Sequence, residues 1–173
     1  MLIYSRQEFE KKAYLWDSSL NCPEYLREVD LALTKEEENA DFWLQPETKA
    51  KLLKRIENEL ISRKAEVVVE KDTGCDYMFT HSRLQELGLM YKIFKRDPVT
   101  LTLIIHKMIP YIEERGEKIV KDEKHLKDPN EFTAKLLDLK QEMDKMIEDS
   151  FLNDMKFQKG RDTSFQNFMN SCS

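Results

Sequence analysis

The sequence predicts an all-α protein on three observations. Apolar residues recur at steps of three and four along most of the chain, which is the spacing of the buried face of a helix. Charged residues make up 35% of the chain and only four of its 173 residues are glycine, which suits long amphipathic helices and leaves few sites for β-turns. Four of the five prolines stand where a helix is expected to begin.

The stretch 82–123 is the one that the other helices are expected to cover. Ser82 followed by Gln85 fits a capping box that begins a helix. Asp97-Pro98 ends this helix and begins the next, because proline disfavours a helical residue before it but is welcome at a first helical position. Pro110 predicts a kink near 106–110 in the second helix. The expected buried residues are Leu84, Leu87, Tyr91, Phe94, Leu101, Ile104, Ile105, Met108 and Ile112.

Three helices are expected before this stretch. The first spans 2–20 and carries aromatic residues among charges, the second begins at Pro23, and the third begins at Pro46 and runs to about 71. The run Val67-Val68-Val69 is assigned to the third helix, because the upstream period is helical and β-propensity is contextual. Residues 72–81 are expected to form a loop. The expected stripes are Leu26, Val29, Leu33, Ala40 and Trp43, then Leu53, Ile56, Leu60 and Val67.

A charged connector without apolar periodicity, 121–127, is expected to separate the remaining helices from the first part. Asp128-Pro129-Asn130-Glu131 fits a capping box with proline at the first helical position, and the helix should run to about 154. Gly160 is expected to separate a final short helix, 163–170, with Phe165, Phe168 and Met169 on one side. The stripe of the longer helix is Phe132, Leu136, Leu139, Met143, Ile147 and Phe151.

The composition disfavours several classes of partner. A net charge of −5 with interspersed signs argues against a nucleic-acid or anionic-membrane surface, because either would require a basic patch. Cys22, Cys75 and Cys172 show no CxxC spacing, which predicts neither a disulfide framework nor a zinc site and fits a reducing compartment. No apolar run approaches about 20 residues and no signal peptide is evident, so a soluble cytoplasmic or nuclear protein is expected.

The sequence predicts no catalytic, cofactor-binding or metal-binding residues. Phosphate-binding glycine loops are absent, and the nearest approach to a metal-ligand pair is Asp122-x-x-His125 in the connector. His81 and His106 have no evident carboxylate or nucleophile partner and are interpreted as structural. Cys75 lacks a flanking base and is interpreted as an unreactive thiol.

Methionines gather toward the C-terminal part of the chain and allow two interpretations. They form either an adaptable binding surface or part of the core. Because they interleave with leucine and phenylalanine at helical spacing, the core is favoured. The residues concerned are Met143, Met146, Met155 and Met169.

Four ordered stretches carry a family resemblance. They are PEYL at 23–26 with Val29, ELISRK at 59–64, DTGC at 72–75 followed by LGLMYKIF at 87–94, and the run from Asp128-Pro129 through LLDLK at 136–140 to SFLNDMKF at 150–157. In this order and spacing, and with Gly116 in the helix between, they resemble the N-terminal stalk of the cullins, the scaffolds of cullin-RING ubiquitin ligases. The last run favours the cullin type that uses BTB-domain adaptors.

The resemblance implies a fold and a function. Cullin stalks contain three successive five-helix repeats, and the chain resembles the second repeat, 1–126, followed by the first helices of the third, 127–173. The substrate adaptor and the RING subunit bind parts of cullins that lie outside these residues. The implied function is a rigid, non-catalytic spacer that holds the adaptor and the ubiquitin-charged enzyme at a fixed separation in ubiquitin-dependent degradation.

Two other functions stay open at this point. One is a helical-bundle tether or adaptor unrelated to ubiquitin, because a fold does not determine a function. The other is an all-α enzyme with His81 or His106 beside carboxylates in a polar concavity. An unfinished final repeat predicts that Phe132, Leu136 and Leu139 are partly uncovered and promote self-association, and it favours an excised part of a longer protein.

Overall fold

The computed structural model describes residues 2–122 and 127–171, and within these ranges every regular element is helical, as predicted. The α-helices are joined by one π-helical turn, η1, and one 3-10 turn, η2. In chain order the elements are α1 (Leu2–Ser19), α2 (Cys22–Trp43), α3 (Pro46–Glu57), η1 (Asn58–Ser62), α4 (Ala65–Val69), α5 (Cys75–Thr80), α6 (Leu84–Phe94), η2 (Pro98–Thr100), α7 (Leu101–Lys121), α9 (Pro129–Phe151) and α10 (Met155–Asn170).

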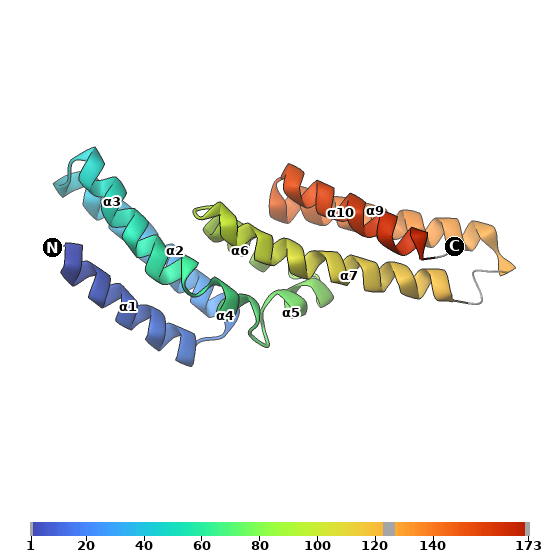
Figure 1. Ribbon diagram of the computed structural model, residues 1–173, viewed down its shortest axis with the longest axis horizontal. Coiled ribbons are helices and arrows are strands. Elements are labelled where there is room, and N and C mark those ends of the chain that lie inside the picture. Colours follow the sequence, from blue (N-terminus) through green and yellow to red (C-terminus); the bar gives the residue numbers. More distant parts are fainter. Residues whose placement is uncertain (1, 123–126, 172–173) are drawn as a thin grey trace.

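The molecule is an elongated rod with its two termini at opposite ends (Figure 1). Helices α1, α2 and α3 form the N-terminal end, and α7, α9 and α10 form the other end. Helix α6 connects the two ends, because it packs against α2 on one side and against α9 on the other. The stretch that begins with α6 is therefore covered by the rest of the chain, as its apolar faces predicted.

Local capping explains where several helices begin. Asn21 Oδ1 accepts a hydrogen bond of 3.0 Å from the amide of Glu24, whose carboxylate accepts one of 3.0 Å from the Asn21 amide, so α2 opens with a capping box. Asp128 likewise accepts from the amide of Asn130 at the start of α9. Prolines occupy the first turns of α2, α3, η2 and α9, which confirms the predicted starts.

The capping box predicted at Ser82 is wrong. Ser82 adopts a left-handed backbone conformation with φ of 52°, and α6 begins two residues later. The amide of Ser82 donates to the carbonyl of Phe79 and that of Arg83 to the carbonyl of Met78, at 3.2 and 2.8 Å. This pair of bonds is a Schellman motif, so Ser82 ends the helix before it instead of starting the next one.

That preceding helix, α5, lies inside the stretch 72–81 that was predicted to be a loop. Gly74 donates to the carbonyl of Lys71 at 2.7 Å and reverses the chain before α5. Cys75, Met78 and Phe79 then lie on one side of the short helix and are buried. Burial against α6 and α7 stabilises a helix too short to be stable alone.

The π-helical turn changes the phase of the third apolar stripe. The amide of Arg63 donates to the carbonyl of Asn58, five residues earlier, at 3.0 Å. This wider turn and the two turn residues that follow it, 63–64, rotate α4 relative to an uninterrupted α-helix, so the prediction of one unbroken helix from Pro46 to about 71 is wrong. Val68 is therefore 1% exposed and Val67 is 46% exposed, so the predicted burial of Val67 is wrong. The prediction of Trp43 as a core residue is also wrong, because Trp43 is the last residue of α2 and is 82% exposed.

Helix α7 continues through Pro110, so this proline lies inside a helix, and the kink expected near 106–110 stays a prediction. Helix α10 continues through Gly160, and the prediction of a separate helix over 163–170 is wrong. A Cβ atom on Gly160 would lie 3.1 Å from Cε of Met108 and 3.2 Å from Cγ2 of Ile105. This glycine therefore allows α10 to lie close against α7.

One hydrophobic core extends from Phe9 in α1 to Phe168 in α10. Its aromatic centre lies where α5 and α6 meet α9 and α10. The ring centroids of Phe151 and Phe157 are 4.2 Å apart, and Tyr91 lies edge-on to both at 5.9 and 5.6 Å. The predicted stripe of α9 is confirmed at Leu139, Met143, Ile147 and Phe151, which are all buried.

Candidate functional site

The two histidines that were considered as catalytic are both exposed, one at the end of α5 and the other on α7. His81 caps the end of α5, where its Nδ1 atom lies 3.0 Å from the carbonyl oxygen of Tyr77 and its ring stacks on the Tyr77 ring. His106 is exposed on α7. Within 2–122 and 127–171, no carboxylate pairs with either ring. His125, the other half of the possible metal pair, lies outside the described residues.

Cys22 and Cys75 are buried free thiols. Burial raises the pKa of Cys22 to about 12 and also raises the pKa of Cys75, because a thiolate would lose its hydration. The Cys75 thiol donates to the sulfur of Met90 at 3.3 Å. Both thiols stay protonated near neutral pH and are part of the core, which agrees with the interpretation of Cys75 as unreactive.

The four methionines do not share one environment. Met143 and Met146 are buried, as the core interpretation predicted, whereas Met155 is 81% exposed and Met169 is 41% exposed. Among the residues that the structure describes, no three histidine, cysteine or acidic side chains are grouped so as to hold a metal ion.

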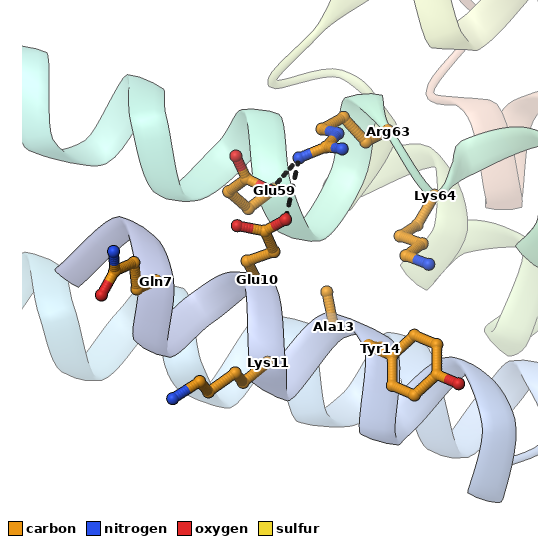
Figure 2. Close-up of a pocket in the computed structure, with 8 residues that line it drawn as sticks. All are labelled: Gln7, Glu10, Lys11, Ala13, Tyr14, Glu59, Arg63 and Lys64. Carbon is orange, nitrogen blue, oxygen red and sulfur yellow. Dashed lines mark hydrogen bonds and ion pairs between the residues drawn. The ribbon is translucent and has the colours of Figure 1, made fainter. Parts of the chain in front are cut away.

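A groove of about 520 Å³ runs between α1 and the segment that follows α3 (Figure 2). The residues of α1 that line it are spaced so that they share one helical face, and the opposite wall comes from η1 and the turn after it. Figure 2 shows Arg63 directed toward Glu59 and Glu10 across the groove, with Tyr14 near one end. The lining residues are Gln7, Glu10, Lys11, Ala13, Tyr14, Glu59, Arg63 and Lys64.

Glu59 is the buried polar centre of this region. Its side chain is 3% exposed, and its two carboxylate oxygens accept from Arg6 Nε at 3.3 Å and from Arg63 Nη1 at 2.8 Å. Arg63 Nη1 also lies 3.8 Å from a carboxylate oxygen of Glu10. A buried carboxylate requires such partners, so the ion pairs connect α1 to η1 and hold the shape of the groove.

A second groove, of about 510 Å³, shares Glu59 with the first. It is lined by Arg6, Lys51, Lys54, Arg55, Asn58 and Glu59. The residues from α3 recur at steps of three and four, which places them on one helical face. We call the two grooves together the α1–α3 surface. The even mixing of charges that was expected from the sequence does not hold here, since seven basic and two acidic residues line this surface.

This surface was not predicted, although part of its signal is present in the sequence. Lys51, Lys54 and Arg55 have the spacing of one helical face, and Glu59 stands four residues before Arg63, the spacing of an ion pair on a helix. The contribution of α1 has no such signal, because about 50 residues separate Arg6 from Glu59 and only folding brings them together. The arrangement can bind anionic groups; it lacks a paired acid and base or nucleophile among its lining residues.

The C-terminal apolar residues that were expected to be uncovered are only partly so. Leu139 is 2% exposed, which contradicts its predicted exposure, while Phe132 and Leu136 are half-buried and Leu137 is 53% exposed. Self-association through this region stays a prediction. Over the described residues, no helix is both long and apolar enough to cross a lipid bilayer.

Comparison with known proteins assigns the chain to a family. The family profile described as "Cullin alpha solenoid domain" matches residues 1–173. Cullin-3A and Cullin-3B of Arabidopsis thaliana are each 31% identical to the chain over 153 residues, which are 88% of this chain and 21% of each relative. Cullin-3 of Dictyostelium discoideum is 26% identical over 171 residues, 98% of this chain and 22% of that relative.

The chain therefore spans about a fifth of the length of these relatives. The similarity to cullin-3 proteins agrees with the predicted type, the one that uses BTB-domain adaptors. Because the profile covers the whole chain and the fold is a series of packed helices, the chain belongs to the cullin family.

Proposed function

We propose that this chain is a segment of the stalk of a cullin-RING ubiquitin ligase and functions as a rigid, non-catalytic spacer. In the complete protein it would hold a substrate adaptor, of the BTB type, and the RING subunit with its ubiquitin-charged enzyme at a fixed separation. A fixed separation raises the effective concentration of one reactant near the other and makes transfer effectively intramolecular. The complex would act in the cytoplasm or nucleus in ubiquitin-dependent degradation.

The observation that carries this proposal is the single core that joins the two ends of the rod. Besides the aromatic centre, three polar contacts connect α9 and α10 to the earlier helices. Ser150 donates to the carbonyl of Leu84 at 2.7 Å, Tyr91 donates to Asp154 at 2.9 Å, and Arg115 forms two hydrogen bonds of 2.6 and 2.8 Å with Glu142. Bidentate Arg–carboxylate pairs restrict orientation as well as distance. A continuous packed core of this kind resists bending.

The same contacts bear on the proposed division into repeats. We infer that residues 1–126 correspond to a second cullin repeat and 127–173 to the first helices of a third. Helix α10 packs along α7 and α9 packs along α6. The two units thus share an interface instead of being joined only by the connector, which supports a stalk that is stiff at the junction.

Stiffness can be measured directly on this chain. Spin labels at Asn39→Cys in α2 and Ala134→Cys in the first turns of α9, both exposed positions near opposite ends of the rod (Figure 1), report the distance between the two ends, with Cys172 changed to serine so that it is not labelled. The buried Cys22 and Cys75 should not react. Pulsed electron–electron double resonance between the two labels should give one narrow distance distribution. A broad or multiple distribution would contradict a rigid spacer.

The ubiquitin-ligase assignment is tested on the longer protein that contains this segment. Affinity purification from cells should recover a RING subunit and a BTB-domain adaptor. Recovery of vesicle-tethering proteins without a RING subunit would instead support the tether and would overturn the ligase assignment. Because this experiment does not depend on stiffness, the two parts of the proposal can fail separately.

A further inference from the structure

The α1–α3 surface carries an excess of positive charge on an acidic chain. Seven basic and two acidic residues line it, whereas the net charge of the whole chain is −5. The remainder of the molecule is therefore more acidic than the chain as a whole. A local reversal of sign concentrates the electrostatic potential on one face.

Part of this charge is already neutralised within the protein. Arg6 and Arg63 pair with Glu59, and Lys64 Nζ lies 3.1 Å from the carboxylate of Asp17. Among the described residues, no acidic side chain pairs with the remaining four basic residues of the surface, Lys11, Lys51, Lys54 and Arg55. Each of the four is exposed.

The surface also has an apolar component at one end. Tyr14 lines the first groove and is 71% exposed, and its neighbour Leu15 is 60% exposed. Exposed tyrosines beside charged residues are common where proteins meet, because the ring buries apolar area and the hydroxyl keeps a polar contact. The grooves are concave and lie between helices, so an extended segment fits them better than a flat surface does.

We propose that the α1–α3 surface binds an acidic segment of another protein, with carboxylates on Lys51, Lys54 and Arg55 and an apolar side chain against Tyr14. The charge distribution favours a short acidic segment over RNA. A long polyphosphate would extend beyond the basic face onto the acidic remainder of the chain and would be repelled there. A flat anionic membrane could contact the exposed lysines, but it would not enter the grooves between the helices as an extended segment would.

The first test maps binding by heteronuclear NMR. A short synthetic peptide of alternating glutamate and leucine is titrated into the ¹⁵N-labelled chain. Amide signals of residues 6–14 and 51–64 should shift, and the shifts should diminish at high salt, because exposed charge pairs are screened. Shifts confined to other helices, or no shifts at all, would overturn the proposal.

The second test compares two triple variants that change the net charge equally. Lys51→Glu, Lys54→Glu and Arg55→Glu reverse the surface, whereas Lys145→Glu, Lys156→Glu and Lys159→Glu reverse exposed lysines of α9 and α10. The first set should weaken peptide binding by about tenfold or more, and the control set by less than about twofold. Equal loss in both sets would show a nonspecific charge effect and would contradict the proposal.

Competition distinguishes the class of partner. Single-stranded polyuridine RNA and phosphatidylserine vesicles are added to the peptide complex at matched negative charge. If the peptide stays bound to residues 6–14 and 51–64, the proposal is supported. If RNA or vesicles displace the peptide and produce the same shifts, the surface recognises nucleic acid or membrane instead, and the proposal is wrong.

Discussion

Gly116 illustrates the constraint that packing places on one residue. It lies buried in α7, where a Cβ atom would overlap the ring of Phe168 in α10. Glycine is a poor helix former, costing about 1 kcal/mol relative to alanine. At this position the absence of a Cβ atom lets Phe168 of α10 pack against α7, and this packing outweighs the lower helix propensity of glycine.

Gly116→Ala should therefore destabilise the protein by about 1–3 kcal/mol despite the better helix propensity of alanine, because the Phe168 ring has to move. Urea denaturation followed by circular dichroism measures this. Gly88→Ala in α6 is the matched control, since the nearest atom to its added Cβ is the Ser150 carbonyl oxygen at 3.6 Å, an ordinary contact. The control should leave stability unchanged or raise it by up to about 1 kcal/mol. Similar losses in both variants would contradict the packing argument.

Tyr91 couples stability to alkaline pH. Burial and the hydrogen bond to Asp154 raise the pKa of Tyr91 to about 12, whereas the pKa of the phenol in an unfolded chain is about 10. Between these values the unfolded chain binds fewer protons than the folded protein, so this contribution to stability falls as pH rises through that window. As pH rises through this window, the urea midpoint should fall less steeply in Tyr91→Phe than in the native chain. Tyr14→Phe removes the hydroxyl of an exposed ring and is the control, so its urea midpoint should change with pH as in the native chain. Identical pH dependences in all three proteins would show that Tyr91 is not responsible.

Among the elements, the π-helical turn decides which valines of the run 67–69 face the core, and these are Val68 and Val69. Val68→Thr places a hydroxyl in the core and should destabilise by about 1–3 kcal/mol. Val67→Thr makes the same chemical change at a half-exposed position and should cost less than about 0.5 kcal/mol. The difference in urea midpoint between the two variants measures which of the two valines faces the core. A larger loss of stability in Val67→Thr than in Val68→Thr would mean that Val67 faces the core, as an uninterrupted helix predicts, and would contradict the change of phase.

At the scale of the whole molecule, α9 and α10 complete the core of the earlier helices. A chain that ends at residue 126 would uncover Phe79, Tyr91 and Met108, which are buried in the complete chain. We expect it to lose about 3 kcal/mol or more of stability and to bind a hydrophobic dye. The control replaces residues 123–126 with glycine and serine at the same length and should retain native stability. A shortened chain as stable as the complete one would show that the two units fold independently.

The self-association expected from the C-terminal helices also belongs to this scale. Leu139 is covered, so any contact between copies would involve the half-buried Phe132 and Leu136 and the exposed Leu137. Sedimentation over a range of concentrations should show a reversible dimer that Leu137→Ser weakens. A strict monomer at high concentration would contradict this.

The helical class, the family and most helix starts could be predicted from patterns in the amino-acid sequence. These depend on signals within a few residues of one another: the apolar period, the prolines at first turns, and Asp128 at the start of α9. Asp97-Pro98 separated α6 from α7 for the same local reason. Such signals act through neighbouring backbone groups, so they can be identified without a tertiary structure.

Which helix faces and residues meet depends on packing between segments that are distant in the chain. The π-helical turn exchanged Val67 for Val68, Gly160 proved to be a close contact instead of a break, and Ser82 ended a helix that only its neighbours stabilise. The α1–α3 surface arose in the same way, because Arg6 and Lys51 come from helices far apart in the chain. These outcomes depend on contacts between distant residues, and the free energy of such contacts does not appear in any local pattern of the sequence.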